Sequence, residues 1–209
     1  MADLINDLIK DGWLKTPAII KAFKEIKRSD FLRDGIKDMA ELNSPLPIGF
    51  RQTISQPLTV AFMLELLQPK AGDRILDVGY GSGWTSALLA DIVGRGNKKG
   101  KVISIEIIPK LKEFGERNIM KYNFIKKGTV ECILGDGSKG RQKSAPFDAI
   151  LASASGKGKI PAAWKKQLAI GGRIVAPMGE SIWLLEKKEK NKFEEKEYPG
   201  FIFVPLIEK

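Results

Sequence analysis

The sequence ILDVGYGSGWTSALLAD, residues 75–91, decides the fold of this chain. An apolar run interrupted by Asp77 has the pattern of a buried strand. Glycines follow at alternate positions, Gly79, Gly81 and Gly83, and apolar residues at helical spacing come after them. Glycine allows a sharp turn and lets a ligand approach the main chain, and the N–H groups that begin a helix point toward such a ligand. The stretch therefore predicts a strand, a ligand-binding turn and a helix.

The ligand expected at this turn is a nucleoside cofactor that needs no phosphate site. The spacing G-x-G-x-G differs from the G-x-G-x-x-G of dinucleotide binders, and no Lys-Ser/Thr pair of a P-loop follows. A second apolar run ends in Glu106, about twenty residues further on, where an acidic residue can bind both hydroxyls of a ribose. A third run ends before Asp136, whose carboxylate can accept from an adenine amino group. S-adenosylmethionine fits this pattern; the alternative is a turn with a purely structural role.

The composition excludes several classes of protein. With 209 residues, 43% of them hydrophobic, the chain is expected to form one domain. The single cysteine, Cys132, excludes a disulfide scaffold and indicates a reducing compartment. The chain has no histidine, which excludes histidine zinc sites, Ser-His-Asp triads and a histidine base, and no metal site is expected. The N-terminal residues do not resemble a signal peptide, and no apolar run is long enough to span a bilayer.

The net charge of +10 and the isoelectric point near 9.6 would suit nucleic acid, acidic lipid or acidic peptides as partners. No basic stripe stands out in the sequence, so a lysine-rich solvated surface is the preferred interpretation. The lysines of 187–196 alternate with glutamates, which indicates a solvated turn.

Residues 1–56 are expected to form an N-terminal helical cap and a substrate loop. Apolar residues at helical spacing predict a helix in residues 1–10, and Thr16-Pro17 begins a second helix. Residues 31–56 contain glycines and prolines with little periodicity, which predicts a long but ordered loop of the kind that is usually functional.

Residues 57–209 are expected to form the cofactor-binding α/β core of the same single domain, 1–209. Strands and helices alternate from Ile75 onward, which predicts a parallel sheet covered on both faces. Ser181–Lys187 and Gly200–Pro205 are predicted as an antiparallel pair of edge strands, joined by the charged turn. The other predicted strands are 74–78, 101–106, 129–134, 147–152 and 173–177, and the predicted helices are 83–93, 109–122, 160–168 and one after Pro57.

Several motifs together resemble the protein-L-isoaspartate O-methyltransferase family over nearly the whole chain. The most specific is Pro47-Ile48-Gly49 followed by Thr53-Ile54-Ser55-Gln56-Pro57, since the Thr-Ile-Ser-x-Pro segment distinguishes that family from other methyltransferases. The other matching segments are Asp77-Val78-Gly79-x-Gly81-Ser82-Gly83, Gly135-Asp136-Gly137, Ala145–Ile150, Gln167-Leu168 with Gly171-Gly172-Arg173, and Phe203–Leu206.

The resemblance implies a Rossmann-like S-adenosylmethionine-dependent methyltransferase fold. This α/β fold has a mostly parallel, doubly wound sheet, an antiparallel C-terminal strand pair and an N-terminal helical cap. The implied acceptor is the free carboxylate of L-isoaspartyl residues in damaged proteins and peptides, whose methyl ester collapses to a succinimide and reopens partly to normal aspartate. The implied cofactor product is S-adenosylhomocysteine. Ser55 is implied as the catalytic hydroxyl, and the implied cofactor-binding residues are Gln52, Thr53, Ile54, Ser55, Asp77, Gly79, Gly81, Ser82, Gly83, Glu106 at the ribose, and Asp136 with Gly137 at the adenine.

The chain departs from the family pattern at Arg51, where glycine is common, and at Tyr80 and Trp84, where smaller residues are common. The loop Ser153–Lys159 also differs from the usual alanine-rich one. These positions bear on the shape of the acceptor pocket rather than on the reaction.

The implied chemistry agrees with the missing histidine. An α-type carboxyl group has a pKa of about 3.5, so at pH 7 it is ionised and needs no general base. The hydroxyl of Ser55 and nearby main-chain N–H groups can hold one carboxylate oxygen by charge-assisted hydrogen bonds. The alternative role of Ser55 is to cap the helix after Pro57.

Two other functions fit parts of the sequence. A nucleic-acid methyltransferase would suit the net charge, but Ala152–Ser155 stands where amino-group methyltransferases carry an Asn/Asp-Pro-Pro-aromatic segment, and Cys132 lies in the wrong strand for base C5 chemistry. A cofactor-binding module without turnover is the second. The preferred interpretation is a monomeric cytoplasmic enzyme that acts on isoaspartyl proteins and peptides, with no stable nucleic-acid partner and no membrane association.

Overall fold

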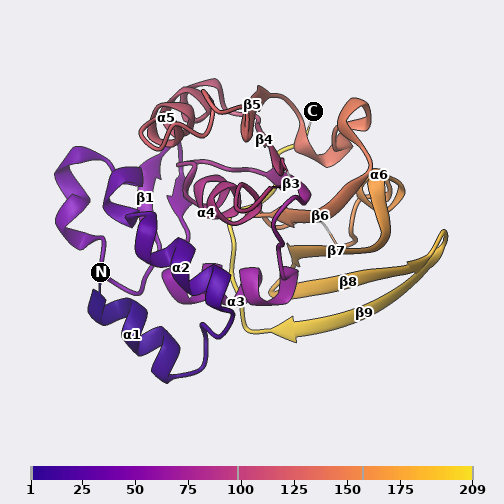
Figure 1. Ribbon diagram of the computed structural model, residues 1–209, viewed down its shortest axis with the longest axis horizontal. Helices are drawn as coiled ribbons and strands as arrows, with labels where there is room; N and C mark the ends of the chain where they lie inside the picture. The colour runs from indigo at the N-terminus through magenta and orange to yellow at the C-terminus, as the bar shows by residue number, and fades with distance from the viewer. Residues whose placement is uncertain (1, 98, 157, 209) are drawn as a thin grey trace.

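The computed structural model describes residues 2–97, 99–156 and 158–208, so Lys157 of the Ser153–Lys159 loop lies outside the described residues. Within them, seven strands form a sheet in the order β5-β4-β3-β6-β7-β8-β9 (Figure 1). The pairs from β5 to β7 are parallel, and β8 and β9 each run antiparallel to the preceding strand, as predicted. The strands are β3 (Arg74–Val78), β4 (Lys101–Glu106), β5 (Val130–Leu134), β6 (Phe147–Ala152), β7 (Leu168–Met178), β8 (Ser181–Glu189) and β9 (Lys192–Pro199).

Both faces of the sheet are covered. Ile75 and Leu151 belong to an apolar cluster that includes most residues of helix α4 (Trp84–Val93). Their neighbours Leu76 and Ile150 belong to a second cluster with Trp164 of helix α6 (Ala162–Gln167). Successive side chains of a strand point to opposite faces, so each strand contributes to both clusters. This burial on two sides confirms the doubly wound arrangement predicted from the alternation of strands and helices.

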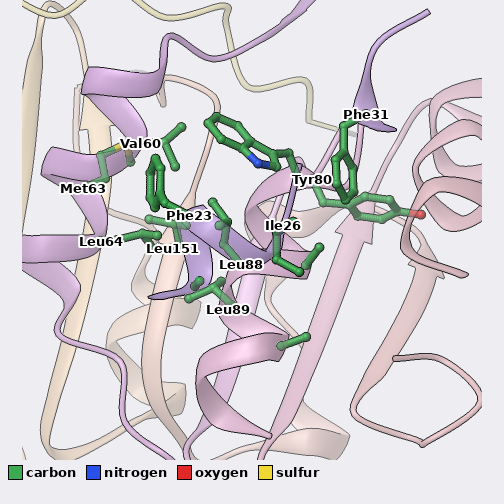
Figure 2. Packing of buried hydrophobic residues seen from close by; sticks show 14 of the residues in the cluster. Phe23, Ile26, Phe31, Val60, Met63, Leu64, Tyr80, Leu88, Leu89 and Leu151 are labelled. Carbon is green, nitrogen blue, oxygen red and sulfur yellow. The ribbon is translucent and has the colours of Figure 1, made fainter. Parts of the chain in front are cut away.

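The helix after the glycine turn is buried on nearly all sides. Every residue of α4 (Trp84–Val93) except Asp91 is buried. On its outer side, Phe23 of α2 packs edge-on against Trp84, with ring centroids 5.6 Å apart. Figure 2 shows Phe23 and Ile26 beside Leu88 and Leu89 in this cluster. The remaining α-helices are α1 (Ala2–Lys10), α2 (Pro17–Glu25), α3 (Pro57–Leu67), α5 (Pro109–Met120) and α6 (Ala162–Gln167).

Residues 31–56 contain regular structure, so the prediction of one long loop was wrong, although the expectation that it is ordered is confirmed. Strands of three or four residues are too short to show an alternating pattern in the sequence. The segment holds part of the 3₁₀ helix η1 (Arg28–Phe31), the 3₁₀ helix η2 (Asp34–Met39), and a hairpin of β1 (Leu46–Gly49) and β2 (Gln52–Ile54).

The prediction of an edge strand at Gly200–Pro205 was also wrong. The strand that pairs with the outer edge of β8 is β9, which occupies much of the predicted charged turn. Most of β9 is exposed, so charged side chains stand on both of its faces and hide the alternation; lysines on an edge strand also discourage pairing with other chains. Gly200 and Phe201 instead bind the carbonyl of Glu180, and residues 204–206 run alongside the loop after β6, where Ser155 and Pro205 form an isolated parallel bridge. No helix in the described part of the chain is long and apolar enough to cross a bilayer.

Candidate active site

A cleft of about 620 Å³, counting the space open to solvent, lies where β3, β4 and β6 end. Ligands of open α/β sheets bind at the carboxyl ends of the strands, because the loops there leave a crevice. Of the twelve residues predicted to bind the cofactor, those that line this cleft are Gln52, Thr53, Ile54, Ser55, Gly79, Gly81, Ser82 and Glu106. The four that do not line it are Asp77, Gly83, Asp136 and Gly137.

The glycine turn is held by main-chain bonds and by close packing. The N–H of Gly79 donates to the carbonyl of Ile105 at 2.8 Å, which ties the turn to β4. Gly83 has a φ of +88°, and a Cβ atom there would lie 2.8 Å from the carbonyl oxygen of Gly115 in α5. Any other residue would therefore separate α4 from α5. Gly83 does not line the cleft, but it allows these two helices to pack closely beside it.

Glu106 lies at the end of β4, with only 5% of its surface exposed. Its Oε2 accepts from the N–H of Gly81 at 3.0 Å, and its Oε1 accepts from the N–H groups of Ile107 and Ile108 at 2.8 and 2.9 Å. Burial raises the pKa of this carboxyl group, and the three N–H donors oppose that rise. Each carboxylate oxygen has two lone-pair directions, so Glu106 can accept further bonds from a ligand in the cleft.

Asp77 belongs to β3, two residues before Gly79, and has no exposed surface. Its Oδ2 accepts from the hydroxyls of Thr85 and Ser86 at 3.0 and 2.6 Å, and Ser86 also accepts from Ser104 at 2.9 Å. Oδ1 has no hydrogen-bond partner within the described part of the chain. Burial raises the pKa of Asp77 to about 6, and the two hydroxyl donors oppose this. Asp77 therefore joins β3 to α4 rather than facing a ligand.

Asp136 and Gly137 follow β5 but do not line the cleft. Oδ1 of Asp136 accepts from both the N–H and the hydroxyl of Ser138, at 3.0 and 2.7 Å, so the side chain caps its own turn. A Cβ atom at Gly137 would lie 2.5 Å from Cγ1 of Val78, which shows how closely this turn packs on β3.

Ser55 stands between two hollows. It lines the main cleft and also a second hollow of about 650 Å³, which is bordered by Gln56 and by the C-terminal residues 202–204. Its hydroxyl makes no hydrogen bond with any residue that the structure describes, whereas its carbonyl oxygen accepts from Arg28 at 3.2 Å. Helix α3 begins at Pro57 with Gln56 as N-cap and has no side-chain cap. The alternative role of Ser55 as a cap is therefore wrong.

Other residues that line the cleft were not among the predicted cofactor-binding residues. Tyr80 donates from its hydroxyl to the carbonyl of Lys112 at 2.9 Å, and burial raises its pKa. Trp84 is buried, and its Nε1 has no partner among the described residues. The sequence marked these two residues only as departures from the family pattern that bear on the acceptor pocket, and nothing in it placed the C-terminal segment here. The remaining lining residues are Ile48, Val60, Thr85, Ile107, Ile108, Leu111, Ser153, Ala154, Val204, Pro205, Leu206 and Ile207.

Comparison with known sequences decides the family of the chain. A sequence model of the protein-L-isoaspartate(D-aspartate) O-methyltransferase (PCMT) family matches residues 1–209. The chain belongs to this family. A protein-L-isoaspartate O-methyltransferase of Methanopyrus kandleri is 38% identical over 208 residues, which cover 98% of this chain and 89% of that protein. The one of Pyrococcus horikoshii is 43% identical over 208 residues, which cover 97% and 90%.

Solved structures agree with this family assignment. A structure described as a PCMT from Plasmodium falciparum, in complex with S-adenosyl-L-homocysteine, has a TM-score of 0.87 at 23% identity, covering 99% of this chain and 98% of that chain. A second protein-L-isoaspartate O-methyltransferase structure has a TM-score of 0.84 at 27% identity, covering 98% of this chain and 65% of the other. The likeness confirms the predicted fold, that of S-adenosylmethionine-dependent methyltransferases.

Proposed function

We propose that this chain transfers a methyl group from S-adenosylmethionine to the free carboxylate of L-isoaspartyl residues in damaged proteins and peptides. The methyl ester then collapses to a succinimide, which begins repair. The observation that carries the proposal is the place of Ser55, which lines both the main cleft and the second hollow and whose hydroxyl has no hydrogen-bond partner among the described residues. Membership of the PCMT family supports the same reaction.

The residues of the main cleft fit the cofactor. Gly79 and Gly81 leave the main chain accessible, and Glu106 presents a buried carboxylate, oriented by three N–H groups, that can accept from two ribose hydroxyls. When bound, S-adenosylmethionine supplies an electrophilic methyl group on a sulfonium centre. Gln52, Thr53, Ile54 and Ser82 would border it. The roles proposed for Asp136 and Gly137 at the adenine rest on their motif, because neither residue lines the cleft.

The acceptor carboxylate needs orientation rather than deprotonation. It is already ionised near neutral pH, and the chain, which has no histidine, offers no histidine base. Ser55 would donate its hydroxyl proton to one carboxylate oxygen and so leave the other oxygen directed at the methyl group. Positioning of two reactants in this way can supply much of the rate enhancement of an enzyme.

We also propose that the protein acts as a cytoplasmic monomer with no stable nucleic-acid partner. The single cysteine supports a reducing compartment, and the interleaved lysines and glutamates of β8 and β9 support a solvated surface rather than a phosphate track.

The test uses labelled S-adenosylmethionine and two peptides that differ only in Asp against L-isoAsp. Label should enter the isoAsp peptide alone and be released as methanol in mild base, as expected of an ester. Equal labelling of both peptides would contradict recognition of the isoaspartyl linkage. Base-stable label in RNA would favour a nucleic-acid methyltransferase. Binding of S-adenosylhomocysteine without label in any acceptor would favour a non-catalytic module.

A further inference from the structure

The turn of the β1–β2 hairpin contains two bulky residues in a conformation that favours glycine. Gly49 pairs with Gln52, so Phe50 and Arg51 form a two-residue turn, and their φ angles are +55° and +57°. Such turns prefer Asn-Gly, because a Cβ atom strains the left-handed region. Strain of this kind persists where the surrounding structure enforces it, and it concentrates at functional sites.

The surrounding contacts hold this turn in place beside the cleft. Nε of Arg33 donates to the carbonyl of Ile48 at 2.7 Å, and its guanidinium lies 4.8 Å from the ring centroid of Phe114 in α5. Nε2 of Gln52 donates to the carbonyl of Phe50 at 3.3 Å. Ile48 and Gln52 line the cleft themselves, so the strained turn borders the mouth of the site.

The turn presents a free cation next to an apolar ring. Arg51 is exposed, and its side chain makes no hydrogen bond or ion pair with a described residue. Phe50 keeps 52% of its surface exposed. The described residues that line the cleft include one carboxylate, Glu106, and no lysine or arginine. The cations directly adjacent in sequence to a lining residue are Arg51, Lys110 and Lys112. Lys110 and Lys112 form ion pairs with Glu113 and Glu116, whereas Arg51 has no ion pair with a described residue.

We propose that Phe50 and Arg51 form a subsite for an acidic residue next to the isoaspartyl residue of the substrate. The guanidinium pairs with the acidic side chain, and the ring of Phe50 covers its methylene groups. The preference for an acidic neighbour rests on the proposed function, because it concerns the same isoaspartyl acceptor. It gives a reason for Arg51 at a position where glycine would remove the strain.

The test measures kinetic constants for isoAsp peptides that carry Glu, Gln or Lys beside the isoaspartyl residue on either side. In the wild type, KM for the best Glu peptide should be about two- to five-fold below that of its Gln counterpart at low salt, the range expected of an exposed ion pair. Arg51→Asn, which tolerates the left-handed conformation, should abolish this difference with kcat unchanged. Arg51→Lys should keep it.

Lys192→Gln is the matched control, since it removes one exposed charge from the β8–β9 hairpin, far from β1 in Figure 1. It should leave the Glu-to-Gln ratio as in the wild type. The subsite is overturned if Arg51→Asn changes KM equally for all three peptides, or if Lys192→Gln changes the ratio as much. Absence of turnover on every isoAsp peptide would overturn the proposed function instead. Fluorescence anisotropy of the same peptides, carrying a fluorophore, would then still measure their binding and so test the subsite.

Discussion

The guanidinium of Arg28 donates a hydrogen bond to the carbonyl oxygen of Ser55, from Nη2 at 3.2 Å. Arg28 has no exposed surface, and it also donates to the carbonyl oxygens of Ala40, Leu42 and Ser44, at 3.2, 2.9 and 2.8 Å. Burial lowers the pKa of Arg28 to about 10, so it remains a cation at neutral pH. One side chain of η1 therefore fixes the main chain on both sides of the β1–β2 hairpin.

We expect Arg28→Met to lower the free energy of unfolding by about 3 kcal/mol, because a buried carbonyl left without a donor costs about 1–3 kcal/mol and the three part-buried carbonyls add smaller costs. Arg28→Lys should lie between this variant and the wild type, since a lysine keeps the charge but cannot reach all four acceptors. Urea unfolding measures both variants. Wild-type stability of Arg28→Met would show that the four bonds are replaced by water at little cost.

Ser55→Ala should lower kcat by about 10²–10³-fold, the loss typical of a donor that acts in the transition state. Binding of S-adenosylhomocysteine and the melting temperature should stay near the wild-type values, because the hydroxyl has no described protein partner and caps no helix. Ser153→Ala, which lines the same two hollows, is the matched control and should change kcat only slightly. A similar loss in both variants would assign the effect to the shape of the cleft.

Glu106→Gln should weaken the binding of S-adenosylhomocysteine, because an amide cannot accept hydrogen bonds from the three N–H groups and from the ribose hydroxyls together. A ligand at about 100 times its Kd stabilises the native state by about 2.7 kcal/mol, so thermal shifts report the change. Glu131→Gln, on the neighbouring strand, should keep the wild-type shift. Asp136→Ala tests the proposed role of Asp136 at the adenine. An unchanged thermal shift with S-adenosylhomocysteine would contradict that role.

Asp77 should make stability depend on pH. Its folded pKa, about 6, lies above its ordinary value of 3.8, so the folded protein binds more protons than the unfolded chain between these values. Stability should therefore fall as pH rises from about 4 to 6 and stay lower above that, by on the order of 3 kcal/mol. In Asp77→Asn the fall should be smaller by about this amount, because the amide does not titrate and its oxygen can still accept from Thr85 and Ser86. Equal pH profiles of the two proteins, from unfolding in urea, would contradict the assignment.

The sequence by itself determined the parallel core and the glycine turn, and it pointed to eight of the residues that line the cleft. Strands such as β3 and β4 are buried on both faces, so their apolar residues stand together in the sequence, and the glycines between β3 and α4 mark the turn. Glu106 could be placed because it ends a predicted strand, and parallel strands end at the same edge of a sheet.

Only the tertiary structure decided which distant segments complete the site. The sequence shows neither that Pro205 lies beside Ser155 nor that Arg28 binds the carbonyl of Ser55, because both contacts join residues far apart in the chain and end on main-chain atoms, which every residue carries. Strand β9 was missed since most of its side chains are exposed and show no apolar alternation. Sequence patterns record which side chains are buried, whereas main-chain pairing is available to almost any residue and is selected by the packed fold.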